Sequence, residues 1–172
     1  MFNILSLFKR TAIVALFAAA MGIASLAPLA AKNFAVPTKN PTVTLAIPDT
    51  WKIEEIEFGY SAVSPGKDVF FSVEFATAGK IETMMKNNEK WMKENKIKMV
   101  KPTQVEAPLN GIDSTVIRFE TTDENGPTTL EFIMIPGGSN RVIVFTLWGS
   151  DDERKKHGPA IDAMMSSIKA IN

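Results

Sequence analysis

The chain of 172 residues contains no cysteine and a single histidine, His157. The lack of cysteine excludes disulfides, cysteine-based zinc sites, iron–sulfur clusters, thiol nucleophiles and a lipidated N-terminal cysteine. The single histidine excludes any site that is built from two imidazoles. Basic and acidic residues are equal in number, 19 of each, so the charge balance does not indicate a nucleic-acid partner. Whole classes of function are therefore excluded before any motif is considered.

The N-terminal segment has the order of a secretory signal peptide. The basic pair Lys9-Arg10 precedes an uncharged apolar run at 11–26, and small residues follow up to Ala31. We expect residues 1–31 to be removed, because a cut one residue earlier would place a proline at the −3 position. The alternative is an uncleaved anchor, but the run is short for a membrane span of about 20 residues. The signal indicates a periplasmic or secreted protein.

The remaining chain is expected to form one domain. Residues 32–41 contain two prolines and little periodicity, and we interpret them as an N-terminal leader to a single domain at 42–172. Alternating apolar residues predict strands. They are expected at 42–47, 51–60 (with a bulge), 69–75, 112–120, 128–135 and 141–148, with a weaker candidate at 98–105.

Two segments have the apolar period of a helix. The first is 81–95. Ser150 and Glu153 have the spacing of a capping box, and a main helix is expected to follow from Pro159 to about Ile171. Turn-forming residues at 123–126 and 136–140 predict that the last three long strands are joined as two hairpins.

The strands at 128–135 and 141–148 are apolar on both faces. Ile143 and Val144, for example, point to opposite sides of one strand. Such a sheet needs cover on both faces, and the two helices are the available cover. We therefore predict an α+β fold, a three-layer α/β/α sandwich with a mainly antiparallel central sheet covered by helices on both faces. The strand at 69–75 has one polar face, which places it near an edge or over solvent.

Three pieces of the sequence resemble the PsbP/Mog/DcrB superfamily. They are the strand and turn at 45–51 (LAIPDTW), the two-hairpin meander at 112–148 and the closing segment at 161–169 (IDAMMSSIK), in which Ile168 replaces the more usual aromatic residue. The resemblance implies an α/β/α sandwich and the role of an accessory or binding module, as in a photosystem subunit, a nuclear-transport accessory protein and bacterial envelope proteins. It implies no lipid anchor, because the lipid-attachment cysteine is missing, and it transfers no binding residue.

His157 is the first candidate for a chemical site. Glu153 lies four residues earlier and would share a helix face with it, but two ligands are too few for a structural metal site. A Ser–His–Asp triad would use the same histidine, yet the chain has no Gly-x-Ser-x-Gly elbow. We predict a solvated histidine beside the basic run 154–156. No catalytic, cofactor-binding or metal-binding residue is expected.

Two groups of carboxylates also have structural interpretations. The segment 123–126 (DENG) lacks the alternating ligands of a calcium loop and is typical of a tight turn. Glu54, Glu55 and Glu57 are explained as charges on the solvent side of an edge strand, where they oppose edge-to-edge pairing.

Arg118 and the methionines leave alternatives open. Arg118 lies between apolar strand residues, and it forms either a cross-strand ion pair with Glu120 or Glu131 or a contact to an anion. The methionine pairs 84–85 and 164–165, together with Met92 and Met99, have the spacing of helices packed on a sheet, and the alternative is an adaptable groove for a peptide or lipid.

The expected function is that of an exported, non-enzymatic accessory or binding protein of the cell envelope that acts through protein–protein contacts. The export signal and the lack of a catalytic constellation support this interpretation. The expected partner is another envelope protein, with no cofactor and no nucleic acid, and with the membrane involved only through an uncleaved signal. The alternatives are a carrier of a small apolar ligand held between a helix and the sheet, or an uncharacterised hydrolase that uses His157.

Overall fold

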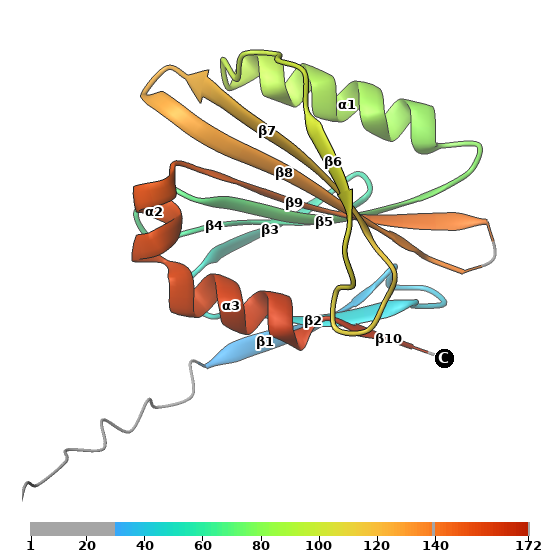
Figure 1. The fold of residues 1–172 in the computed structure, drawn as a ribbon. Helices are drawn as coiled ribbons and strands as arrows, with labels where there is room; N and C mark the ends of the chain where they lie inside the picture. Colours follow the sequence, from blue (N-terminus) through green and yellow to red (C-terminus); the bar gives the residue numbers. More distant parts are fainter. Residues whose placement is uncertain (1–29, 139, 172) are drawn as a thin grey trace, which may run out of the picture.

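The computed structural model describes residues 30–138 and 140–171, so the predicted export signal lies almost entirely outside the described residues. None of the helices within this range is long and apolar enough to cross a membrane. Figure 1 shows the elements, which are β1 (Ala31–Val36), β2 (Val43–Pro48), β3 (Lys52–Ile56), β4 (Gly59–Val63), β5 (Phe70–Thr77), α1 (Ile81–Glu94), β6 (Thr103–Glu106), β7 (Thr115–Asp123), β8 (Gly126–Pro136), β9 (Arg141–Gly149), α2 (Asp151–Lys156), α3 (Gly158–Ser167) and β10 (Lys169–Ala170).

Seven strands form one large antiparallel sheet in the order β3-β4-β5-β9-β8-β7-β6. Its central strands are apolar on both faces, as the sequence predicts. Ile143 and Val144 of β9 are both fully buried, and they belong to hydrophobic clusters on opposite sides of the sheet. The sheet is therefore the middle layer of the molecule.

Helix α1 covers one face of the large sheet (Figure 1). Met84 and Met92 of α1 are buried in the same cluster as Leu130 and Phe132 of β8 and Val144 of β9. The apolar stripe of the helix therefore packs on the sheet, which confirms core packing for these two methionines.

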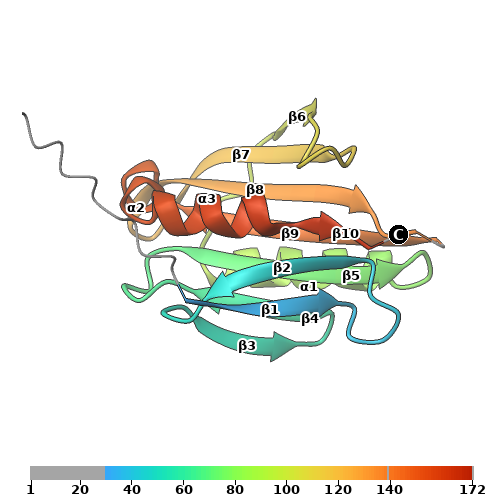
Figure 2. The ribbon, with the colours of Figure 1, turned by 90° about the horizontal axis from the view of Figure 1, so that it is seen from below.

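A second sheet covers much of the opposite face. Strands β1 and β10 pair with the two sides of β2, and α3 lies beside this small sheet (Figure 2). Leu45 and Ile47 of β2 share one buried cluster with Phe71, Phe145 and, from α3, Ile161. The predicted sandwich with helices on both faces is therefore wrong. The fold is a β-rich α+β fold, with 48% of the described residues in strands and 21% in helices.

The physical reason is that α3 is shorter than predicted and that the predicted leader forms a strand. The side-chain amide of Asn110 donates to the carbonyl oxygens of Met165 and Ile168, at 2.7 and 3.0 Å, where the helix ends. The chain then pairs with β2 as β10 instead of continuing as a helix to Ile171. On the other side of β2, residues from the predicted leader form β1.

Two strand predictions are also wrong in detail. The segment 51–60 is a hairpin of β3 and β4, not one bulged strand. A Cβ atom at Gly59 would lie 2.1 Å from the carbonyl oxygen of Val73, so glycine is required where β4 approaches β5. Strand β5 is central, not marginal, and its polar residues Ser72 and Glu74 are buried.

The predicted turns and the capping box are confirmed. Asp123 pairs with Gly126 across the β7–β8 hairpin, and the backbone N–H of Asn125 donates to the Asp123 carboxylate at 2.7 Å. Ser150 and Glu153 form the reciprocal hydrogen bonds of a capping box at the start of α2. The edge position of β3 also agrees with the interpretation of its carboxylates.

Candidate functional site

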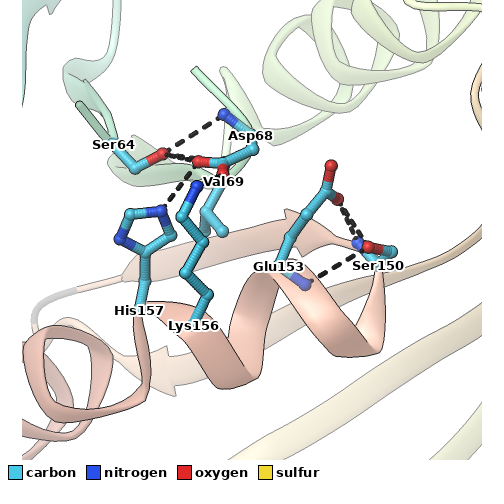
Figure 3. Close-up of polar contacts among 7 residues, drawn as sticks. All are labelled: Ser64, Asp68, Val69, Ser150, Glu153, Lys156 and His157. Carbon is cyan, nitrogen blue, oxygen red and sulfur yellow. Dashed lines mark hydrogen bonds and ion pairs between the residues drawn. The ribbon is translucent and has the colours of Figure 1, made fainter. Parts of the chain in front are cut away.

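The turn between β4 and β5 is built around the side chain of Ser64, which is 2% exposed. Its Oγ accepts hydrogen bonds from the backbone N–H groups of Asp68 and Val69, at 3.2 and 3.0 Å, and donates to Oδ1 of Asp68 (Figure 3). A Cβ atom at Gly66 would lie 2.8 Å from both carboxylate oxygens of Asp68. A side chain at position 66 would therefore displace the carboxylate of Asp68.

His157 reaches this carboxylate from the junction of α2 and α3 (Figure 3). Its Nε2 atom lies 2.8 Å from Oδ1 of Asp68, and the two side chains are only 14% and 15% exposed. The imidazole also meets the ring of Trp51 edge-on, with 6.0 Å between the centroids. Lys156 donates to Oδ2 of Asp68 at 2.6 Å. The predicted solvated histidine is therefore wrong, because residues distant in the sequence enclose the ring.

The carboxylate of Asp68 is held in its ionised form. Burial alone would raise the pKa of Asp68, but hydrogen bonds from Lys156, Ser64, its own backbone N–H and His157 outweigh that effect. Together they hold the pKa of Asp68 far below the ordinary range of an aspartate. The carboxylate therefore acts as a permanent acceptor for its neighbours at physiological pH.

The three residue types of a catalytic triad meet here, but not in catalytic order. A nucleophilic serine donates to histidine, and the aspartate lies on the far side of the imidazole. In this cluster Ser64 and His157 both contact the same oxygen of Asp68, so the carboxylate is central. Ser64 is also buried, with its hydroxyl committed to Asp68 and to backbone N–H groups. The arrangement joins the β4–β5 turn to the α2–α3 junction and does not activate a nucleophile.

Glu153 does not combine with His157 in a metal site. Its carboxylate accepts hydrogen bonds from the backbone N–H and the hydroxyl of Ser150, at 2.8 and 2.7 Å (Figure 3). Within residues 30–138 and 140–171, no group of three or more histidine, cysteine, aspartate or glutamate side chains is placed to hold a metal ion.

Arg118 forms ion pairs, which was one of its two predicted interpretations. Its guanidinium lies 3.3 Å from Glu131 across the β7–β8 hairpin and 3.4 Å from Glu120 on its own strand. Glu131 also pairs with Arg154 of α2. Sequence reasoning missed Arg154, since a basic residue on a short charged helix carries no sign of a distant partner.

The sequence analysis also missed a cluster of buried polar side chains beneath α1. Glu74 and Ser72 of β5, Asn88 of α1 and Thr146 of β9 are all buried. Burial raises the pKa of Glu74. The side-chain nitrogen of Asn88 and the hydroxyl of Thr146 have no hydrogen-bond partner among the described residues. The available signal was Asn88 itself, which lies four residues from a buried methionine on either side.

Comparisons with known proteins identify the fold. No protein-family model and no curated protein sequence matches the chain. The solution structure of cyanobacterial PsbP (CyanoP) from Synechocystis sp. PCC 6803 is similar, with a TM-score of 0.55, 10% identity, and coverage of 86% of this chain and 96% of that chain. A crystal structure from Bacteroides thetaiotaomicron gives a TM-score of 0.51 and 14% identity, and covers 82% of this chain.

The chain spans about half of the Bacteroides protein, since the match covers 48% of it. LpqN, which is involved in cell envelope biogenesis of Mycobacterium tuberculosis, gives a TM-score of 0.49 and 14% identity, with coverage of 83% of this chain and 92% of that chain. At such identities, likeness concerns the fold and not the function. The protein has a PsbP-like fold, in agreement with the resemblance of its sequence.

Proposed function

We propose that the protein is an exported, non-enzymatic accessory or binding protein of the cell envelope that acts through protein–protein contacts. The observation that carries this proposal is the open edge of the large sheet at β6. Within the described residues β6 pairs only with β7, and all four of its residues are exposed. Val105 of β6 is 56% exposed, and Met99, which precedes the strand, is 52% exposed. These are two of the three exposed large apolar side chains of the described residues.

The opposite edge of the same sheet is protected by charge. Strand β3 carries Lys52, Glu54 and Glu55 as exposed residues, and Lys52 and Glu54 form an ion pair at 2.6 Å. Charged side chains on an edge strand oppose pairing with another chain. The two central residues of β6, Gln104 and Val105, are uncharged, and Glu106 is its single charged residue. This edge therefore favours the addition of an extended segment, whose main chain pairs with the edge and whose side chains contact Val105.

The polar cluster at the β4–β5 turn supports a non-enzymatic role. Ser64, Asp68 and His157 use their polar groups to hold two parts of the chain together. The predicted export signal supports a location in the envelope, because secretory signals direct proteins out of the cytoplasm.

Site-specific photo-crosslinking in the native envelope tests the proposal. A photo-reactive residue at Val105 is expected to give one defined adduct, whereas the same residue at Glu55 on the charged edge gives none. Val105→Lys is expected to abolish function in a complementation assay without changing thermal stability, because it places a charge on the exposed edge. Deletion of the crosslinked protein should reproduce the phenotype of deleting this one. Equal adducts at both edges, or full function of Val105→Lys, would contradict the proposal.

The non-enzymatic part has a separate test. His157→Gln retains an N–H donor for Asp68, so it is expected to fold and to complement a deletion strain as well as the unmodified protein. A folded His157→Gln variant that fails to complement would show that the imidazole is needed for chemistry, and the hydrolase alternative would then replace this proposal.

A further inference from the structure

A pocket lined by aromatic residues lies at the end of the large sheet where α1 ends. It has a volume of about 300 Å³ and is lined by Phe70 of β5, Trp91 of α1 and Trp148 of β9, with the β7–β8 turn and the start of α2 completing its wall. None of these three aromatic residues is fully buried. We call it the aromatic pocket. Figure 1 shows how the end of α1, the β7–β8 turn and α2 converge at this end of the molecule.

The aromatic rings form a corner. The rings of Trp91 and Trp148 are perpendicular, with 5.4 Å between their centroids. Phe70 lies against Trp91 at 4.6 Å. The faces of aromatic rings carry partial negative charge, so an aromatic lining attracts a positive group.

The lining of the aromatic pocket is acidic. Asp68, Asp123, Glu124 and Glu153 contribute four carboxylates against the single ammonium of Lys67. Two lysines from outside the lining neutralise part of this charge, since Lys96 pairs with Glu124 and Lys156 pairs with Asp68. One negative charge remains in excess after both pairs are counted.

The end of α1 adds to this field. Asn95 caps the C-terminus of the helix and lines the aromatic pocket. The C-terminal end of a helix carries partial negative charge and attracts cations. Aromatic faces, carboxylates and a helix C-terminus thus all favour a positive guest.

We propose that the aromatic pocket binds an organic cation, an alkylammonium or guanidinium group. Within the described residues no three histidine, cysteine, aspartate or glutamate side chains are placed to hold one metal ion, so the proposed guest is not a metal ion. An anion would meet the excess of carboxylates. The chemistry is shared by free amines and by lysine and arginine side chains, and the choice of probes distinguishes them.

Titration of the purified protein with small probes tests the proposal, monitored by calorimetry and by tryptophan fluorescence. The probes are choline, n-butylammonium as the lysine analogue, and ethylguanidinium as the arginine analogue. The matched control is 3,3-dimethylbutanol, which has the shape of choline without its charge. We expect at least one cation to bind about tenfold more tightly than this neutral isostere at low salt, as cation–π attraction in a partly desolvated site predicts.

Three variants separate the contributions of rings and charges. Trp91→Leu is expected to weaken cation binding at least about fivefold. The double variant Asp123→Asn/Glu124→Gln is expected to weaken it about threefold and to reduce its salt dependence. Glu82→Gln, at the other end of α1, is the control and should bind as the unmodified protein does.

Thermal unfolding establishes that each variant is folded. The proposal would be overturned if none of the three cations binds, if choline and its neutral isostere bind with equal affinity, or if folded Trp91→Leu binds as tightly as the unmodified protein. A preference for choline would indicate a free quaternary amine, and a preference for butylammonium or ethylguanidinium would indicate a basic side chain. The assay does not involve the β6 edge, so its outcome is independent of the proposed function.

Discussion

Replacement of Asp68 by asparagine is expected to destabilise the protein by about 2–3 kcal/mol at neutral pH. The carboxylate accepts hydrogen bonds from Ser64, His157 and Lys156, and the side chains of Asp68 and His157 are largely shielded from water. An amide of the same shape keeps one acceptor oxygen but loses the charge that strengthens each bond.

The magnitude follows from the individual contacts. A hydrogen bond to a charged group contributes about 1.5–3 kcal/mol, against about 0.5–1.5 kcal/mol for a neutral one, so the shielded bonds to Ser64 and His157 each lose about 1 kcal/mol. The side chain of Lys156 is 62% exposed, so its ion pair adds only about 0.5 kcal/mol. For a domain of this size the total corresponds to a decrease in Tm of about 10 °C.

The stability difference should also depend on pH. Because the pKa of Asp68 is lowered in the folded protein, its stabilising effect is fully present above the pKa of the unfolded chain, about 3.9. The effect is lost as the pH falls below that value toward the folded pKa. The unfolding free energies of Asp68→Asn and the unmodified protein should therefore converge between about pH 4 and pH 2.

Urea denaturation monitored by circular dichroism, at a series of pH values, measures both effects. Asp162→Asn is the matched control, since Asp162 is an exposed aspartate on α3. If Asp68→Asn is no less stable than Asp162→Asn at pH 7, or if its deficit stays constant down to pH 2, the structural role assigned to this carboxylate is refuted.

Three further predictions follow from the burial pattern and from the N-terminal signal. Because the pKa of Glu74 is raised in the folded protein, ionisation of this carboxyl opposes folding, and the stability of the unmodified protein should fall as the pH rises above about 4.3. Glu74→Gln should raise the urea midpoint at pH 7 and remove this fall. An unchanged dependence of stability on pH would contradict the prediction. Ile143→Asp and Val144→Asp should each cost several kcal/mol in denaturation, since each buries a carboxyl on its own face of the sheet, and a harmless substitution would refute the two-sided core. Intact mass of the envelope-extracted protein should show a start at Ala31 or Lys32, whereas a full-length product would indicate an anchor.

Sequence patterns predicted the large sheet well because its strands alternate over long distances. Residues 128–135 and 141–148 have apolar side chains in both phases, which indicates a layer on each face, and the turn between them contains residues that tolerate positive φ. The apolar period and the turn residues do not indicate whether a helix or a second sheet covers each face. The small sheet was missed because β1 lies in a proline-containing segment and β10 has only two residues.

The polar contacts were harder to predict because they join residues far apart in the sequence. His157 and Asp68 are 89 residues apart. The basic residues just before His157 predicted a solvated side chain instead of a shielded one. The position of strand β5 was predicted wrongly for a similar reason. Ser72 and Glu74 suggested exposure, whereas Asn88 on the buried stripe of α1 provides a polar surface above them. Recognition of that buried asparagine would have corrected the position of the strand.

The two partners of β2 also determine when the protein is able to fold. β2 pairs with β10, and the backbone N–H of Ala46 donates at 2.8 Å to the hydroxyl of Ser167, which lies 121 residues further along the chain. Until that distant segment is available, Phe71 and Phe145 lack part of the layer that buries them. Contacts of such sequence separation form late and slowly. A chain of this topology therefore stays without its complete native core until its last strand has been synthesised.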